Sequence, residues 1–192
     1  MLWPKFVCFA LVGLAFGQLY QVASEETISI CPENFTQVAD KCLLVDNKWK
    51  NFYESDRHCR SLNAELLSIK NVIELNAINE WLPSIAPYQP EFWTGGNKLG
   101  VTRSYEYYWQ STGELATYLP WKEGQPTPAS GDCLKLLANV TMTPEEAILS
   151  EHRLTVANCT QWAGHICQTP LQVFKTQLCL NTSAFFEARI PV

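Results

Sequence analysis

Residues 121–133 read WKEGQPTPASGDC, and this stretch organises our interpretation of the whole chain. Its two prolines stand one residue apart, which predicts a stiff, irregular loop instead of a helix or a strand. Gln125, Thr127 and Asp132 are residues of the types that bind hydroxyl groups or cations, and Trp121 supplies an aromatic anchor. A rigid loop with such side chains is a candidate binding surface. Taken alone, the two prolines would also fit a plain surface turn.

From Cys31 to Cys167 the chain resembles a C-type lectin-like domain. In that family a Trp stands four residues ahead of a Glu-Pro-Asn or Gln-Pro-Asp triplet, and a Cys follows. The corresponding residues here are Trp121, Gln125-Pro126-Thr127 and Cys133. The aromatic stretch EFWTGG at residues 91–96 is similar to secreted insect lectins of this type. The resemblance implies an α+β fold, in which two helices pack on small antiparallel sheets beside a long ligand-binding loop region, stabilised by disulfides.

The beginning of the chain has the layout of a secretory leader: Lys5, an apolar run over residues 6–16, and Gly17. We therefore expect residues 1–17 to be a signal peptide and residues 18–30 a linker. The C-type lectin-like domain is expected over 31–168, followed by a tail, 169–192, for which we expect partial disorder. The apolar run is too short to span a bilayer, and no second one follows. These features predict a secreted, extracellular protein without a membrane span.

The charge balance of the chain excludes some classes of partner. Removal of the leader reduces the basic residues from 14 to 13 against 19 acidic residues, so the formal net charge becomes −6. Nucleic acids and anionic membranes attract proteins with a basic surface. We therefore expect neither as a partner.

Seven of the eight cysteines lie after the leader, and in an exported chain they indicate a disulfide framework. The resemblance implies three bridges: Cys59–Cys167, Cys133–Cys159 and Cys31–Cys42. Cys179 in the tail is left unpaired, and we expect it to link two chains into a disulfide-bonded homodimer. The alternative is a thiol capped by a small thiol compound.

Two helices are predicted from capping signals. Asn51 and Glu54 have the spacing of a capping box, and the following residues place an apolar face on a helix: Phe52, Ser55, Cys59 and Leu62. His58 lies off this face, and we expect it to be solvated. Asn71 and Glu74 start a second helix that we expect Pro83 to end. Later, residues 133–137 alternate as in a strand, and 139–153 form a connection longer than is usual in the family.

The resemblance also implies where calcium would bind: its ligand positions read Gln125, Thr127, Gly131, Thr155 and Val156 here. Ca²⁺ takes about 6 to 8 oxygen ligands, many of them charged. All three carboxylates expected at these positions are missing. In the family, Asp132 belongs to an auxiliary calcium site, and there Lys98 replaces an Asp. We therefore expect no metal or other cofactor, with Glu145, Glu146 or Glu151 as the residues that would replace the lost ligands if calcium were bound.

The sequence shows no motif of an enzyme, such as Gly-x-Ser-x-Gly, His-Glu-x-x-His or a phosphate-binding glycine loop. Its three histidines, at 58, 152 and 165, stand in unrelated contexts. Glycosylation sequons begin at Asn34, Asn139 and Asn181. A fourth, at Asn158, has Cys159 as its middle residue and is not expected to be used, because that cysteine is assigned to a bridge.

These observations predict a secreted C-type lectin-like recognition protein that is not an enzyme. The expected ligand is a carbohydrate of the galactose type, bound near a degenerate calcium site by loops 121–132 and 139–156. We expect the contacts from Trp121, Gln125, Thr127 and Asp132. The alternative is a calcium-independent module of the same fold that binds another extracellular protein.

Overall fold

The computed structural model describes residues 27–101, 106–127, 130–144, 147–181 and 184–191, and at 147, 175–181 and 184–190 it describes the backbone alone. The chain divides into two compact units. The larger is Glu33–Pro170, and the smaller combines the segments before and after it. The expected signal peptide, 1–17, and most of the linker, 18–30, lie outside the described residues.

The larger unit is built on a mixed sheet with the strand order β2-β3-β9-β5-β7-β8, to which β4 and β6 add short pairings. All pairs are antiparallel except β5 with β9, which run parallel. The strands are β2 (Thr36–Val38), β3 (Lys41–Lys50), β4 (Glu65–Leu66), β5 (Glu91–Asn97), β6 (Tyr108–Trp109), β7 (Cys133–Met142), β8 (Ala147–Ala157) and β9 (Ala163–Pro170). With the two helices described below, this arrangement confirms the expected α+β fold.

Helix α1 (Phe52–Ser61) begins at the predicted capping box. Asn51 Oδ1 accepts a hydrogen bond from the Glu54 backbone N–H at 2.9 Å, and the Glu54 carboxylate accepts one from the Asn51 backbone N–H at 3.4 Å. The predicted apolar face is buried at Phe52, Ser55 and Cys59. Leu62 is the exception, with 40% of its surface exposed, because the helix ends at Ser61 and Leu62 no longer follows the helical period.

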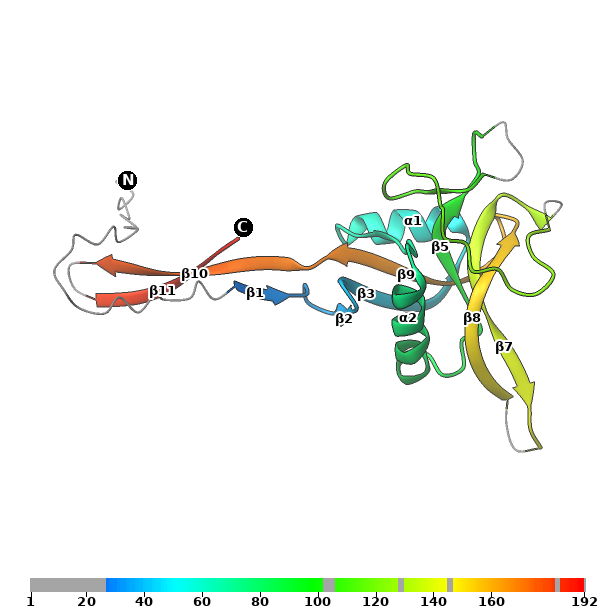
Figure 1. The fold of residues 1–192 in the computed structure, drawn as a ribbon, viewed down its shortest axis with the longest axis horizontal. Coiled ribbons are helices and arrows are strands. Elements are labelled where there is room, and N and C mark those ends of the chain that lie inside the picture. Colours follow the sequence, from blue (N-terminus) through cyan, green and yellow to red (C-terminus); the bar gives the residue numbers. More distant parts are fainter. Residues whose placement is uncertain (1–26, 102–105, 128–129, 145–146, 182–183, 192) are drawn as a thin grey trace. The chain divides into compact units, whose positions relative to one another are not determined.

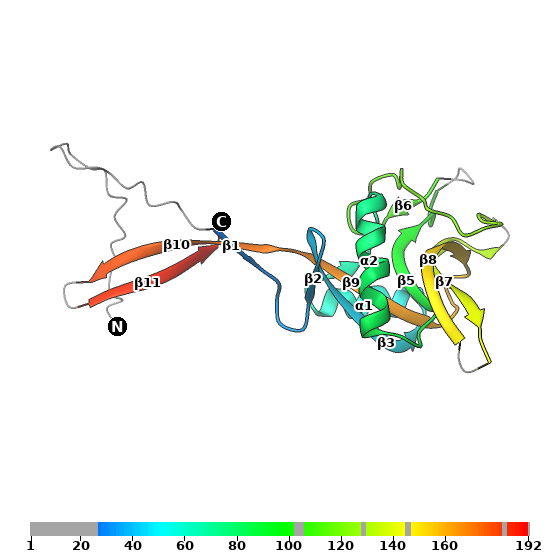
Figure 2. The ribbon, with the colours of Figure 1, turned by 60° about the horizontal axis from the view of Figure 1, so that its bottom comes forward.

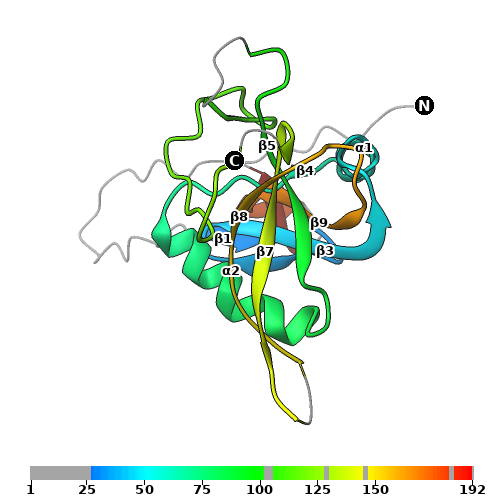
Figure 3. The ribbon, with the colours of Figure 1, turned by 90° about the vertical axis from the view of Figure 1, so that its right-hand side faces the viewer.

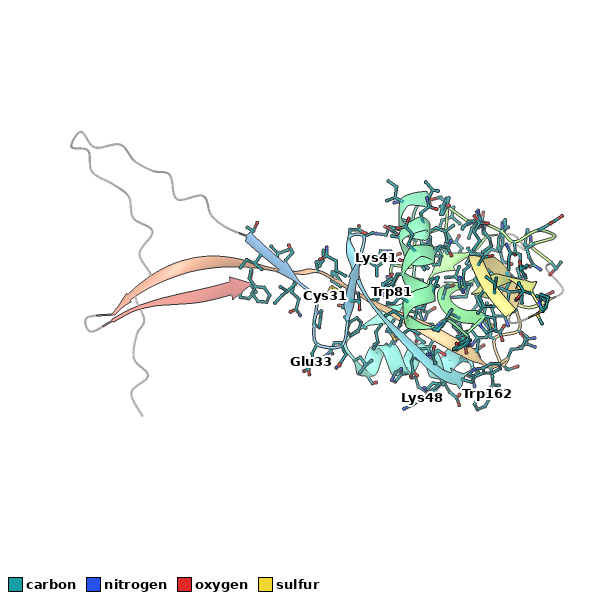
Figure 4. All side chains as sticks on the ribbon, turned by 90° about the horizontal axis from the view of Figure 1, so that it is seen from below. Cys31, Glu33, Lys41, Lys48, Trp81 and Trp162 are labelled. Atoms are coloured by element: carbon teal, nitrogen blue, oxygen red, sulfur yellow. A yellow bond between two sulfur atoms is a disulfide. The ribbon has the colours of Figure 1, made fainter. Side chains whose placement is uncertain are left out.

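Helix α2 (Val72–Ile85) begins where Asn71 Oδ1 accepts a hydrogen bond from the Glu74 backbone N–H at 3.0 Å. The expectation that Pro83 ends this helix is wrong. A proline removes one backbone donor, but the last turn still closes through the Ala86 N–H, which donates to the Leu82 carbonyl at 2.8 Å. The start of α2 is also tied to β3 by an ion pair, in which Lys41 Nζ lies 2.7 Å from the Glu74 carboxylate. Figure 4 labels Lys41, at the start of β3.

The core of the larger unit lies where the sheet meets the helices. Figure 3 shows α1 and α2 on different sides of the strands β3, β9 and β5. One group of buried side chains includes Phe92, Leu134 and Leu154, and a second surrounds Trp93 and the cysteines. Aromatic and branched aliphatic side chains bury much apolar surface, which is the main stabilising contribution to such a core.

Two disulfides link segments of the larger unit: one joins α1 to β9, and the other joins β7 to the turn after β8. Cys59 of α1 is bonded to Cys167 of β9, with a Cα–Cα distance of 5.3 Å. Cys133 of β7 is bonded to Cys159, with a Cα–Cα distance of 5.2 Å. Both pairings are those that the family resemblance implied. Cys31 and Cys42 are disulfide-bonded as well.

The segment expected to be a long connection, residues 139–153, instead belongs to a β-hairpin. Strands β7 and β8 pair out to Met142 and Ala147, and Figure 1 shows the hairpin extending beyond the rest of the larger unit. The β-branched and apolar residues on both sides of the turn satisfy their backbone groups by pairing, which a loop would leave to solvent. Glu145 and Glu146 lie outside the described residues.

The smaller unit contains a three-stranded antiparallel sheet with the order β1-β10-β11. Its strands are β1 (Thr27–Ile30), β10 (Gln172–Asn181) and β11 (Ala184–Pro191). The expected partial disorder of the tail is therefore wrong for the described residues, since β10 and β11 pair along their length (Figure 2). Cys179 stands opposite Phe186 in this pairing, and its side chain is not described. Neither α1 nor α2, the helices of the described chain, is long and apolar enough to cross a membrane.

Candidate functional site

The predicted binding loop, 121–132, begins against the edge of β8. The Leu154 N–H donates to the Pro120 carbonyl, and the Lys122 N–H donates to the Leu154 carbonyl, both at 2.9 Å. Trp121 and Leu154 thereby form an isolated parallel β-bridge. These bonds satisfy backbone groups that an edge strand otherwise leaves open. They fix the start of the loop to the sheet.

Trp121 anchors the loop to the core. It is half-buried, and its ring meets Tyr107 edge-on at a centroid distance of 5.5 Å. Such edge-to-face pairs stabilise by about 0.5–1.5 kcal/mol beyond the area they bury. Tyr107 itself is buried, and burial raises the pKa of its phenol. Trp121 was predicted to bind the ligand, but only the exposed part of its side chain can contact one.

Gln125 holds the centre of a small polar cluster. Its Oε1 accepts hydrogen bonds from the backbone N–H of Val156 at 3.0 Å and of Thr127 at 3.3 Å. Its Nε2 donates to Thr127 Oγ1 at 3.2 Å. The peptide bond between Gln125 and Pro126 is cis. The three hydrogen bonds orient the carboxamide of Gln125 in one direction.

Ser130 completes the cluster, and sequence reasoning did not single it out. Its Oγ lies 2.6 Å from Thr127 Oγ1, and the residue is exposed. The only sequence signal for it is its position three residues after Thr127 inside the loop, where a turn brings the two together: the Ser130 N–H donates to the Thr127 carbonyl at 2.9 Å. Gln125, Thr127 and Ser130 together present amide and hydroxyl groups at one place.

Gly131 stands where the resemblance implies a glutamate, and the backbone leaves no room for one. Its φ of 137° lies in the range that L residues rarely adopt. A Cβ added there would overlap the Ala157 carbonyl and lie 2.5 Å from the Asn158 nitrogen. A glycine is therefore required by the turn at this position.

Thr155 and Val156, the last two mapped calcium positions, are buried in β8. The Thr155 hydroxyl lies 3.5 Å from the Val156 carbonyl. Neither residue offers a carboxylate, and Thr127 offers only a hydroxyl. A site for Ca²⁺ needs about 6 to 8 oxygen ligands, usually with several carboxylates. The mapped positions do not supply a donor set that fits Ca²⁺.

Asp132 is exposed on the loop, but a cation already faces its carboxylate. Lys98 Nζ lies 3.4 Å from Asp132 Oδ1. The backbone joins the same two residues, because the Lys98 N–H donates to the Asp132 carbonyl at 2.8 Å. Glu151, the described candidate for a substitute ligand, is paired with Arg153 at 3.2 Å. Both acidic groups are thus engaged with basic side chains.

The β7–β8 hairpin exposes apolar side chains on both of its faces. Val140 and Met142, two residues apart on β7, share one face, and Met142 is 76% exposed, whereas Ile148 stands opposite Thr141 and is exposed on the other face. Lys122 connects the loop to this hairpin, since its Nζ donates to the Ala138 carbonyl at 3.2 Å and to the side-chain oxygen of Asn139. An apolar side chain exposed alone is ordinary, whereas several together indicate an interaction surface.

The structure corrects the expectation for one histidine. His58 is not simply solvated: its Nδ1 lies 2.7 Å from Nε2 of His165. Burial lowers the pKa of His165 to about 4, and a nearby carboxylate, Asp46, opposes this in part. His152 is also buried, and burial lowers its pKa to about 4 as well. Helical periodicity could not indicate the contact of His58, because it depends on a strand over a hundred residues away.

The described sequon residues differ in their surroundings. Asn34 and Asn139 are exposed, and Asn181 stands at the end of β10, with its side chain not described. Asn158 Oδ1 accepts hydrogen bonds from the Thr160 N–H at 3.0 Å and from its hydroxyl at 2.9 Å. The exposed sites at Asn34 and Asn139 are therefore open to a modifying enzyme.

Comparison with known proteins gives one family. The model of the Lectin C-type domain matches residues 48–169. C-type lectin 37Da of Drosophila melanogaster is 30% identical over 105 residues, which are 55% of this chain and 54% of that protein. Ladderlectin of Oncorhynchus mykiss is 26% identical over 117 residues, or 61% of this chain and 60% of that protein. The chain thus matches little more than half of the length of these relatives.

Solved structures agree on the fold. A calcium-independent type II antifreeze protein superposes with a TM-score of 0.61 at 17% identity, covering 75% of this chain and 97% of that one. Human lithostathine superposes with a TM-score of 0.60 at 18% identity, covering 81% of this chain and 98% of that one. At such low identity the likeness concerns the fold alone.

Proposed function

The chain belongs to the C-type lectin domain family, and we propose that it is a secreted recognition protein that binds a carbohydrate without calcium. The ligand contacts the cluster of Gln125, Thr127 and Ser130, with the exposed part of Trp121 beside it. Sugars present several hydroxyl groups, each of which can donate and accept hydrogen bonds. A cluster of amide and hydroxyl groups is chemically matched to them.

The observation that carries this proposal is the fixed orientation of Gln125. Its Oε1 is held by the Val156 N–H at 3.0 Å, and one proton of Nε2 is directed to Thr127. The second proton of Nε2 is then available for an acceptor on the ligand. Because the loop holds the amide in place before binding, less conformational entropy is lost when the ligand arrives.

Independence from calcium follows from the groups that surround this cluster. Lys98 faces Asp132, and Gly131 cannot carry a carboxylate without displacing the backbone. A cation near Asp132 would be repelled by the ammonium group of Lys98. It would also find no carboxylates at the mapped calcium positions to replace its hydration shell. The calcium-independent antifreeze protein that shares the fold is compatible with a domain of this kind that works without the metal.

A glycan array tests this proposal. We expect the protein to bind a restricted set of glycans, with the same signal in calcium and in EDTA. Gln125→Ala should weaken the binding at least tenfold, whereas Glu123→Ala, in the exposed part of the same loop, should leave it unchanged. Both variants should remain folded; Glu123→Ala should melt at the temperature of the parent and Gln125→Ala a few degrees lower, because the Val156 N–H loses its acceptor. Loss of all signals in EDTA, or equal binding by Gln125→Ala, would contradict the proposal.

The second candidate function is binding of an extracellular protein, which the exposed side chains of the β7–β8 hairpin favour. Val140 and Met142 expose apolar side chains on one face of this hairpin, and apolar side chains are typical of the centre of a protein interface. If no glycan binds, a pull-down from extracellular fluid with the parent and with Met142→Ser tests this alternative. A partner retained by the parent and lost with Met142→Ser supports it, and a partner retained equally by both excludes the hairpin as the contact.

A further inference from the structure

We propose that Asp46, His58 and His165 form a zinc-binding site in the larger unit, away from the 121–132 loop. Three ligand atoms converge there. His58 Nδ1 lies 2.7 Å from His165 Nε2, and Asp46 Oδ2 lies 3.4 Å from the first and 3.7 Å from the second. The residues come from α1, β9 and β3, the elements grouped together in Figure 3.

The fold holds these residues in place. Asp46 and His165 stand directly opposite each other in the pairing of β3 with β9. His58 immediately precedes Cys59, whose disulfide to Cys167 ties α1 to β9 two residues after His165. A site built on paired strands and a cross-linked helix keeps its ligands close to the required geometry.

The donor set suits zinc. Zn²⁺ is bound by histidine nitrogens and carboxylate oxygens at about 2.0–2.2 Å, so in a tetrahedral site the ligand atoms stand about 3.3–3.5 Å apart. The two distances to Asp46 Oδ2, 3.4 and 3.7 Å, are close to that value. The two histidine nitrogens are hydrogen-bonded at 2.7 Å, so zinc would replace the shared proton and the partly exposed ring of His58 would move outward by about half an ångström. Imidazole ligands favour zinc and similar transition metals, whereas Ca²⁺ requires oxygen ligands. The site therefore selects zinc over calcium.

A fourth ligand position is left on the solvent side. The side chain of His58 is 30% exposed, whereas His165 is fully buried. Cys167 has its sulfur near both histidines, but that sulfur is in a disulfide and cannot serve as a thiolate ligand. Three protein ligands with an open position for water are typical of zinc sites that bind a further molecule.

Two groups around Asp46 tune the site in opposite directions. The Lys48 N–H donates to Asp46 Oδ1 at 2.8 Å, which turns Oδ2 toward the histidines. Lys50 Nζ lies 3.1 Å from the same Oδ2 and competes with a metal. His165 Nδ1 has no hydrogen-bond partner in the described part of the chain, and it must carry the proton when Nε2 binds zinc. Competition by Lys50 weakens zinc binding, and so does the Nδ1–H of His165, which has no partner among the described residues. We therefore expect a dissociation constant in the micromolar range.

Calorimetry with ZnCl₂ on the whole mature protein, in a buffer that does not bind zinc, tests the site. We expect one zinc per chain, and no heat with calcium. His58→Ala should weaken binding at least tenfold, while Arg57→Ala, its exposed neighbour on α1, should not change it. Lys50→Gln should bind zinc more tightly than the parent, an increase that adventitious binding at another place would not show.

A second measurement does not depend on variants. The chain has three histidines, so His152 serves as an internal control in a proton NMR titration with zinc. The ring protons of His58 and His165 should shift at one equivalent, and those of His152 should not. No saturable zinc heat, or a His58→Ala variant that binds as well as the parent, would overturn the proposal and leave a hydrogen-bonded histidine pair.

Discussion

Lys98 places its Nζ 3.4 Å from Oδ1 of Asp132, with the lysine side chain only 11% exposed and the aspartate 54% exposed. The ammonium group is therefore held at the base of the loop, beneath a carboxylate that faces solvent. It lies 5.9 Å from the centroid of Tyr107, which further restricts it. A positive charge fixed at this place opposes a divalent cation more effectively than a mobile one, because it cannot swing into bulk water.

The first prediction is that calcium does not stabilise this protein. Extracellular calcium sites operate at dissociation constants of about 0.1–1 mM, so the test is made in that range. We expect no binding heat and no rise in melting temperature. Lys98→Ala alone should not create tight binding, because Thr127, Gly131 and Val156 still lack carboxylates. Stabilisation by calcium that EDTA reverses would show this prediction to be wrong.

The second prediction concerns Gly131. Gly131→Ala should destabilise the protein by about 2–3 kcal/mol, because the new Cβ meets the backbone of Ala157 and Asn158 at a strained φ. Gly124→Ala is the matched control: it also has a positive φ, 79°, but nothing lies within 4 Å of its Cβ, so it should cost only about 1–2 kcal/mol. Urea denaturation of both variants measures the difference. Equal losses would show that the clash at Gly131 is relieved.

The helices were predictable because their signals are local. The capping residues Asn51 and Asn71 each bond to a backbone N–H three residues later, and the sequence shows both partners. Pro83 misled us for a reason equally local: a proline in the last turn removes a single bond, which the helix tolerates. Residues 139–153 form a hairpin instead of a loop because β7 pairs with β8. The strand-forming residues on both sides of the turn were the sequence signal for this pairing, and we missed it.

The site was predictable only in part. The family pattern located Gln125, Thr127 and Asp132, and the structure brings the first two together. Asp132 is paired with Lys98 instead. The contact of His58 with His165 spans 107 residues of sequence, and no pattern within α1 indicates which strand it will meet. Contacts between distant segments are set by the packing of the whole unit, which a sequence alone does not show.

The third prediction concerns the disulfides. Replacing Cys59 and Cys167 by serine should cost about 5 kcal/mol, because that bridge joins residues separated by 108 positions and constrains the unfolded chain strongly. Replacing Cys133 and Cys159, separated by 26 positions, should cost about 3.5 kcal/mol. Both pairs are buried, which makes them a matched comparison. Thermal melting ranks the two variants, and the reverse order would contradict an effect of loop length.

The fourth prediction is a covalent dimer through Cys179. After the three bridges this cysteine is left without an assigned partner in a chain that we expect to be exported. An intermolecular disulfide should give a dimer band in non-reducing electrophoresis that disappears in dithiothreitol and in Cys179→Ser. Gln177→Ser, two residues earlier on β10, is the control and should keep the dimer. A parent that runs as a monomer, with a mass increase that matches a small thiol, would instead indicate a capped cysteine.

The fifth prediction follows from His152, whose buried ring has its pKa lowered from 6.5 to about 4, mainly by loss of hydration. In the unfolded chain it regains the ordinary value, so between pH 6.5 and 4 the unfolded state binds the extra proton. The contribution of neutral His152 to the free energy of unfolding is therefore fully present above pH 6.5 and is lost as the pH falls toward 4. A pKa difference of 2.5 corresponds to a loss of about 3 kcal/mol from this group.

Urea denaturation between pH 7.5 and 4 measures this effect, with His152→Gln compared with the parent at each pH. His165 and the carboxylates also titrate in this range, but they are common to both proteins, so the difference between the two curves isolates His152. The variant starts less stable, since the ring contact with Phe92 is lost, and it should lose less stability on acidification. The gap between the two proteins should therefore narrow by about 3 kcal/mol toward pH 4. Parallel curves would mean that His152 is protonated in the folded protein as easily as in the unfolded one, and that its burial does not hold it neutral.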